Sequence, residues 1–190
     1  MINKFLKFFL FFMLFSNNIF AKNSSTQEQI MLAGGCFWGI EELFRNFDGV
    51  IETEVGYTGG FTNNPNYESV SSGLSGHAET VKIVFDNSKT SLEKILKYFF
   101  AIHDPTQLNR QQNDIGTQYR SEIFYFNQEQ KIKAENIIQQ AENSKIYKSK
   151  ILTKISPASK FYKAENYHQK YLKNNPEGYT CHYYRKEWKF

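Results

Sequence analysis

The sequence predicts an α+β fold: a two-layer α/β sandwich with a ferredoxin-like core, long irregular loops and an irregular C-terminal tail. Segments in which apolar and polar residues alternate, as in half-buried strands, are interleaved with segments that carry an apolar stripe of helical period. The stretches that connect them are too long and irregular for a repeat protein. Elements mixed in this way bury their apolar faces by packing a helical layer on a sheet.

The first predicted unit is a strand, a helix and a second strand. Residues 30–33 form a short apolar run that Gly34-Gly35 ends, as expected for a buried strand followed by a turn. The next segment carries apolar residues at i, i+3, i+4 and i+7, which predicts an amphipathic helix that Asp48-Gly49 stops. Its apolar positions are Ile40, Leu43, Phe44 and Phe47. Residues 51–57 then alternate as a half-buried strand.

The second predicted unit follows a long irregular stretch. Residues 59–77 are rich in Gly, Asn, Ser and Pro without an apolar period, and loops of this length in compact domains tend to be functional. Residues 81–85 alternate as a strand. The string from Thr90 to Glu93 offers a capping box for a helix that ends at Asp104-Pro105.

The last third of the chain repeats this alternation more loosely. A second irregular stretch, residues 106–120, leads to a predicted strand at 121–126 and a polar helix from about Gln128 to Asn143. A last strand is expected near residues 151–155, before a largely irregular tail.

Residues 1–21 have the pattern of a signal peptide. Lys4 and Lys7 precede an unbroken apolar run over residues 8–15, and Ser16-Asn17-Asn18 interrupts it well before the roughly 20 apolar residues that span a bilayer. We therefore expect cleavage after Ala21, export, with the periplasm as destination, and no membrane association after signal removal. The mature chain, residues 22–190, is expected to be one domain and a monomer.

The composition excludes some classes of function. The formal net charge is +4, with basic and acidic residues interspersed, so no basic groove for nucleic acid is expected. The four histidines, His77, His103, His168 and His182, do not combine with the two cysteines into a metal-ligand spacing. We expect no metal and no cofactor.

Cys36 stands where a strand ends and a helix begins. Backbone N–H groups and the positive end of the helix dipole would then face its sulfur and lower the pKa of the thiol. The helix stripe is already supplied by residues 40–47, which leaves Phe37 and Trp38 free to line a pocket suited to a thioether or methyl group. A buried structural cysteine beside core aromatics is the alternative.

Several strings together resemble one family. GGCFWG (34–39), GYTGG (56–60), NPNYESV (64–70), GHAE (76–79), HDPTQ (103–107) and residues 112–121 resemble, in order and spacing, the type A peptide methionine sulfoxide reductases. The resemblance covers essentially Ile30 to Tyr179. It implies that the chain reduces methionine S-sulfoxide, free or in oxidised proteins and peptides.

The resemblance also implies roles for individual residues. Cys36 would be the nucleophile, and Phe37 and Trp38 the wall that holds the substrate methyl group. Glu79 would be the acid at the sulfoxide oxygen, because the sulfur becomes electrophilic only as its oxygen is protonated. Burial would keep that acid neutral, whereas a solvated glutamate at the start of a strand is the alternative. The hydroxyls of Tyr67 and Tyr119 would assist, and Asp114 would help to fix the pocket and the substrate backbone.

Cys181 is the candidate for the second half of the cycle. A sulfenic acid on Cys36 would condense with a second thiol to a disulfide, which a thioredoxin-like reductant would recycle. The tail around Cys181 is aromatic and basic rather than glycine-rich, and no third cysteine follows. Resolution by an external thiol or by a partner's cysteine therefore stays open.

Two rival functions remain. Cys36 with His168 and Asn174 has the order and spacing of a papain-like cysteine hydrolase, although the second cysteine of that signature is missing. Alternatively, a Cys36–Cys181 disulfide could staple an exported binding module without activity.

Overall fold

The computed structural model describes residues 26–190, so the expected signal peptide lies outside the described residues. Its centre is a four-stranded antiparallel sheet in the order β6-β1-β3-β2, which together with two helices has the β-α-β-β-α-β connection of a ferredoxin-like core. The predicted α+β class is thereby confirmed. These elements are β1 (Gln27–Gly34), α1 (Phe37–Arg45), β2 (Val50–Thr58), β3 (Ala78–Asp86), α3 (Leu92–Ile102) and β6 (Ser121–Tyr125).

Two further strands extend the sheet at its edges. β7 (Lys154–Pro157) pairs in parallel with β6, and β8 (Tyr162–Lys163) pairs antiparallel with β2. A separate two-stranded ladder joins β4 (Arg110–Gln111) to β5 (Asp114–Ile115). Apolar and polar residues alternate along strands such as β2 because successive side chains point to opposite faces, and one face of the sheet carries the main core.

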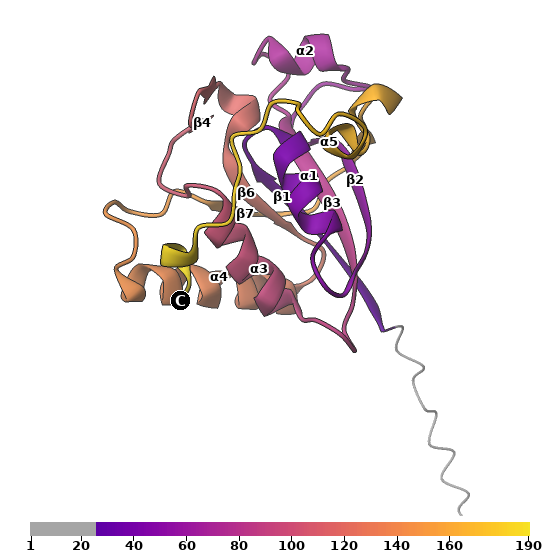
Figure 1. The fold of residues 1–190 in the computed structure, drawn as a ribbon. Coiled ribbons are helices and arrows are strands. Elements are labelled where there is room, and N and C mark those ends of the chain that lie inside the picture. The colour runs from indigo at the N-terminus through magenta and orange to yellow at the C-terminus, as the bar shows by residue number, and fades with distance from the viewer. Residues whose placement is uncertain (1–25) are drawn as a thin grey trace, which may run out of the picture.

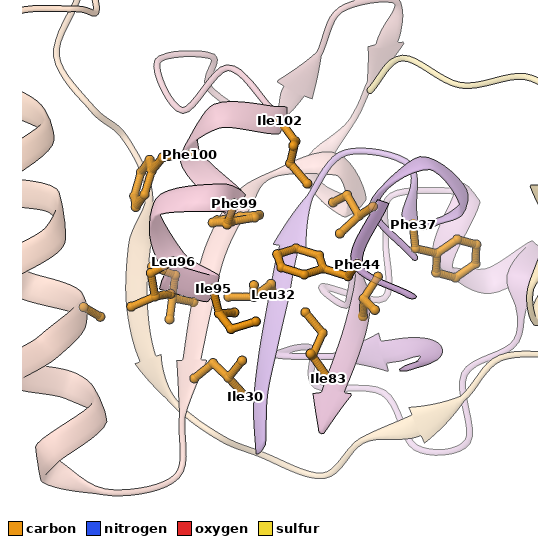
Figure 2. Close-up of a cluster of buried hydrophobic side chains, with 14 of the residues drawn as sticks. Ile30, Leu32, Phe37, Phe44, Ile83, Ile95, Leu96, Phe99, Phe100 and Ile102 are labelled. Atoms are coloured by element: carbon orange, nitrogen blue, oxygen red, sulfur yellow. The ribbon is translucent and has the colours of Figure 1, made fainter. Parts of the chain in front are cut away.

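The main core lies between the sheet and a layer of helices. α1, α3 and α4 (Gln128–Ser144) send apolar side chains onto the face of the sheet formed by residues such as Ile30, Leu32 and Ile83. Figure 2 shows these side chains, with Phe37 at one end of the cluster. A smaller cluster on the opposite face contains Met31 and Phe124 and is covered by the segment that follows β7. The two faces explain why β1 is apolar on both sides.

Several details differ from the sequence expectations. The loop over residues 59–77 contains a short helix, α2 (Tyr67–Ser71), whose N-cap Asn66 makes a capping box with Ser69. The capping box expected at Thr90 is wrong: Ser91 is the N-cap of α3 and accepts from the backbone N–H of Lys94 at 3.3 Å. Ile51 is 51% exposed, because an irregularity between residues 50 and 52 shifts the register of β2.

The C-terminal tail crosses the molecule. It includes the single-turn helices η2 (Asn166–His168), α5 (Tyr171–Asn174) and η3 (Lys186–Trp188), and is otherwise irregular as predicted. Figure 1 shows the tail passing from α5 over α1 toward α4, where the chain ends. Within residues 26–190, no helix is long and apolar enough to cross a membrane.

Candidate active site

Cys36 is the residue between the end of β1 and the start of α1. The turn before it needs glycine: Gly35 has φ +111°, and a Cβ there would lie 2.6 Å from the Gln111 side chain. Cys36 is the N-cap of α1 and is 7% exposed. The sulfur is therefore held at a fixed place, almost out of water.

The expected low pKa of Cys36 is not what this environment produces. Burial raises the pKa of the thiol well above its usual value, and the Glu79 carboxylate acts in the same direction when ionised. The backbone N–H of Trp38 lowers the pKa, as expected at a helix start, but this effect is smaller. The sequence expectation is thus wrong in sign, because desolvation outweighs the helix terminus.

Glu79 projects from β3, where its backbone pairs with Tyr57 of β2. Its carboxyl Oε2 accepts the backbone N–H of Phe37 at 3.1 Å, so the acid lies against the first turn of α1 beside Cys36. The side chain is buried, and burial raises its pKa to about 8. At neutral pH this carboxyl is mainly protonated and can donate a proton.

Two tyrosines from the irregular stretches surround this acid. Tyr67 begins α2 and is 38% exposed, whereas Tyr119 ends η1 (Thr117–Tyr119) and is half-buried. Burial, followed by the nearby Glu79 carboxylate, raises the pKa of both phenols. Both hydroxyls therefore stay protonated and can donate hydrogen bonds near Glu79.

Phe37 and Trp38 take different places at the site. Phe37 is 1% exposed and its ring centroid lies 5.9 Å from that of Tyr57, so it is also part of the core. Trp38 is half-buried, stacks on Tyr171 at 3.8 Å, and donates from Nε1 to Nδ1 of His168 at 3.0 Å. The indole is therefore fixed on one face and at its polar edge.

The sequence expectations did not include Glu165, and they named His168 only in the rival hydrolase and among the histidines without a metal-ligand spacing. The Glu165 carboxylate accepts the Tyr57 hydroxyl and the backbone N–H of Tyr67, each at 2.9 Å. His168 is buried, with its ring centroid 4.8 Å from that of Tyr67. Neither residue lies in a segment with an apolar period. Only the pattern E-x-x-H after β8 could have indicated them from the sequence.

The rival cysteine hydrolase needs a histidine on the sulfur of Cys36. His168 instead uses Nδ1 for the Trp38 indole and turns Nε2 toward Glu165, 3.8 Å away. Burial lowers the pKa of His168. Asn174, the third residue of that reading, bonds through its backbone N–H to Lys170. Cys36, His168 and Asn174 therefore follow one another in the sequence as in a papain-like hydrolase, but their side chains are not arranged as a catalytic triad.

Cys181 approaches the site from the tail. The backbone N–H of Cys36 interacts with the Cys181 sulfur, and burial with the adjacent Asp114 carboxylate raises the pKa of the Cys181 thiol to about 12. The Tyr179 hydroxyl donates to Oδ1 of Asp114 at 3.1 Å. Both cysteines are free thiols. The fold thus brings together Cys36, Cys181 and Asp114, although they are far apart in sequence.

His182 fixes the chain directly after Cys181. Its Nε2 lies 2.8 Å from the carbonyl oxygen of Gly34, and its Nδ1 lies 3.3 Å from the sulfur of Cys181. Gly39 of α1 has no room for a Cβ, which would lie 2.3 Å from Thr180. In residues 26–190, no three His, Cys, Asp or Glu side chains are grouped to hold a metal ion.

Comparison with known proteins gives one consistent family. The model of the family described as peptide methionine sulfoxide reductase matches residues 28–189. A peptide methionine sulfoxide reductase MsrA from Nocardia farcinica is 50% identical over 84% of this chain and 91% of its own.

Solved structures agree with that match. Reduced Mxr1 from Saccharomyces cerevisiae is 35% identical, with a TM-score of 0.80 over 84% of this chain and 93% of its own. Methionine sulfoxide reductase A of Corynebacterium diphtheriae is 37% identical, with a TM-score of 0.76 over 83% of this chain and 79% of its own.

Proposed function

The chain belongs to the peptide methionine sulfoxide reductase family and is an oxidoreductase that reduces methionine sulfoxide, and from this premise we propose how its residues perform the reaction. Cys36 attacks the sulfur of the S epimer, free or in a polypeptide, and becomes a sulfenic acid. No cofactor takes part. The observation that carries the proposal is the buried pair of Cys36 and Glu79, joined through the first turn of α1.

The resting pair is suited to a proton exchange. Because burial raises the pKa of both groups, thiol and carboxyl are both neutral before substrate arrives. Two buried anions side by side would be costly here, whereas two neutral acids are not. Charge is then created only when a sulfoxide oxygen is present to receive the proton of Glu79.

In the proposed step, the Cys36 sulfur attacks the sulfoxide sulfur while Glu79 protonates the sulfoxide oxygen. The oxygen passes with its proton to the Cys36 sulfur, methionine leaves as the thioether, and the proton lost by the thiol returns to Glu79. The sulfoxide sulfur gains two electrons and Cys36 loses two, as in the oxidation of a thiol to a sulfenic acid.

The surrounding groups position the sulfoxide. The Tyr67 and Tyr119 hydroxyls donate hydrogen bonds to the oxygen, which gathers negative charge as attack proceeds. Phe37 and Trp38 provide the apolar wall for the methyl group. Asp114 holds the substrate backbone through Oδ2, because its Oδ1 already accepts the Tyr179 hydroxyl.

Resolution by Cys181 completes the proposed cycle. Its sulfur lies beside the backbone of Cys36, so it can attack the sulfenic acid and form a disulfide with loss of water. A thioredoxin-like protein then reduces that disulfide, and the enzyme acts as a monomer. Mxr1 has been solved in complex with Trx2; that structure is 23% identical to this chain, so its likeness extends to the fold alone.

We also propose that residues 1–21 direct export to the periplasm. The support is the order of two lysines, an apolar run and Ala21 at the expected cleavage position. N-terminal sequencing of the protein from a periplasmic fraction should begin at Lys22. Recovery of the uncleaved chain from the cytoplasm would refute this localisation.

Separated epimers of N-acetyl-methionine sulfoxide test the reaction. Without reductant, the protein should release close to one equivalent of product from the S epimer and none from the R epimer. An epoxide-type cysteine-protease inhibitor should leave this yield unchanged, because in residues 26–190 His168 bonds to Trp38 and not to the Cys36 sulfur. Equal yields from both epimers, or none from either, would exclude the mechanism.

A further inference from the structure

The most exposed large apolar side chains of residues 26–190 lie on the loops that build the active site. Phe61 and Leu74 are each 79% exposed, Ile115 is 67% exposed and Leu108 is 66% exposed. The first two belong to the loop that carries α2, and the other two lie on either side of Asp114 in the segment that leads to η1. Single exposed apolar residues are ordinary, but Phe61 and Leu74 line one groove together, and a shared apolar surface of this kind indicates a binding site.

A groove of about 500 Å³ lies beside the first two of these side chains, Phe61 and Leu74. Phe61 and Leu74 line it together with Asn109, Thr117 and Arg120. The backbone N–H of Phe61 donates to the Ser75 carbonyl at 3.2 Å. Its ring packs so closely on Gly76 that a Cβ there would lie 2.7 Å away. The ring is therefore supported from below while its outer face is open to solvent.

The groove and the active site share a wall. Thr117, which lines the groove, donates to the Gly73 carbonyl at 3.2 Å and so ties η1 to the loop of α2. Tyr119, at the other end of η1, lies near Glu79. A 3₁₀ helix rises about 2 Å per residue, so about 4 Å along the axis separates the two positions.

The charges at the groove do not call for a highly charged ligand. Arg120 and Glu122 form an ion pair of 2.6 Å, and both are buried. Lys154 adds one exposed cation. An uncharged, partly apolar ligand therefore suits the groove better than an acidic one.

We propose that this groove binds the residues next to an oxidised methionine in an unfolded polypeptide, with their apolar side chains on Phe61 and Leu74. The proposal rests on the proposed function and specifies its substrate class. Methionine usually lies among apolar residues in protein cores, and the polar sulfoxide disrupts that packing. An extended chain advances about 3.3 Å per residue, so neighbours one to three positions away can reach the groove.

Three substrates test the proposal with dithiothreitol as reductant. They are N-acetyl-methionine S-sulfoxide, a peptide with leucine and valine beside the sulfoxide, and a matched peptide with serine and glycine there. The parent should favour the apolar peptide. In the double variant Phe61→Ser, Leu74→Ser, kcat/KM for the apolar peptide should fall roughly tenfold, because two apolar contacts with the bound peptide are lost. The kcat/KM values for the other two substrates should not change.

Ile132→Ser is the matched control, because Ile132 is 48% exposed and lies on α4, far from α2 in Figure 1. It should leave all three substrates unchanged. Equal kcat/KM of the parent for both peptides would overturn the proposal, as would an equal loss on all three substrates in the double variant. Failure of the proposed function itself is distinguishable, because N-acetyl-methionine S-sulfoxide would then not be reduced at all.

Two other occupants of the groove give different results. If the double variant loses activity only when thioredoxin replaces dithiothreitol, the groove docks the reductant and the proposal is wrong. If sedimentation shows a parent dimer that the double variant abolishes, the groove is a contact between copies of this chain and the proposal is equally wrong. A roughly tenfold loss on the apolar peptide that is the same with thioredoxin as with dithiothreitol, together with an unchanged sedimentation result, supports a polypeptide ligand.

Discussion

The two cysteines occupy opposite kinds of structure. Cys36 is the N-cap of a core helix, 7% exposed, with its neighbours fixed by the sheet and by α1. Cys181 is half-buried on an irregular tail, held by single contacts to Asp114 and His182. A nucleophile that meets a bound sulfoxide needs a fixed position. In the proposed cycle, the second thiol reacts only with the sulfenic acid, so it can be supplied by the tail, where the neighbouring His182 is anchored to Gly34.

Replacing the fixed thiol should have the largest effect. Cys36→Ser should reduce product release from the S epimer to background, because an alcohol at this place supplies no nucleophile comparable to sulfur at neutral pH. The measurement is single-turnover release of methionine, with circular dichroism to show that the fold is unchanged. Residual release near one equivalent would mean that another residue attacks the sulfoxide.

Glu79→Gln should slow the chemical step by roughly 10²- to 10⁴-fold, the usual contribution of a positioned general acid. The amide can donate a hydrogen bond to the oxygen but cannot deliver a proton as a carboxylic acid does. Rapid-quench measurement of the single-turnover rate checks this. A rate within a few-fold of the parent would assign the proton to Tyr67 or Tyr119 instead.

Cys181→Ser should separate the two halves of the cycle. Single turnover should stay close to one equivalent and leave a sulfenic acid that dimedone traps. Turnover with thioredoxin should fall by roughly 10²-fold, because an internal thiol acts at a far higher effective concentration than an external one. Dithiothreitol should restore much of the rate. Normal turnover with thioredoxin would show that one cysteine suffices.

The pH dependence of the single-turnover rate should report the protonation of Glu79, which lies beside Cys36. In the proposed mechanism Glu79 must be protonated, and burial raises its pKa to about 8, so the single-turnover rate should be retained below that value and fall as pH rises through it. Above pH 8 the decline approaches about tenfold per pH unit, as for one required proton. Glu79→Gln should lack this decline. A rate that keeps rising to pH 10 would contradict a neutral acid.

The smallest effect is expected at the edge of the methyl-binding wall. His168→Phe removes the acceptor of the Trp38 indole N–H while keeping an aromatic ring. Loss of one such hydrogen bond is worth about 1 kcal/mol, so KM should rise roughly fivefold with little change in kcat. His168→Asn, which retains an acceptor, should recover part of the loss. A fall in kcat alone would place His168 in the proton path.

The sequence predicts those parts of the structure that depend on interactions between residues close together in the chain. The stripe of α1, the apolar run of β1 and the alternation of β2 and β3 are local patterns, so these elements were predicted, although β1 begins at Gln27 rather than Ile30. The apolar residue Ile51 is exposed because an irregularity in β2 shifts the register, which alternation alone cannot reveal.

The electrostatics of the site were harder to predict. The local pattern at Cys36 indicates a helix start, which lowers a thiol pKa, whereas burial by distant segments raises it by more. Glu165 and His168 reach the site only through the path of the tail, to which no local period corresponds. The residue types at Glu79, Tyr67 and Tyr119 came from the resemblance, and their roles remain predictions.

The anchor at His182 limits how long a sulfenic acid on Cys36 could survive. The next residues hold the tail firmly, since Arg185 bonds to the carbonyls of Ala101 and Ile102, each at 2.9 Å, and His182 bonds to Gly34. Cys181 is thus tethered one residue from a fixed point, with its sulfur beside the backbone N–H of Cys36. Peroxide, which drives a sulfenic acid irreversibly to the sulfinic state, would have to compete with that neighbour. In the proposed cycle, the tether would thereby protect the enzyme from the oxidants whose damage it repairs.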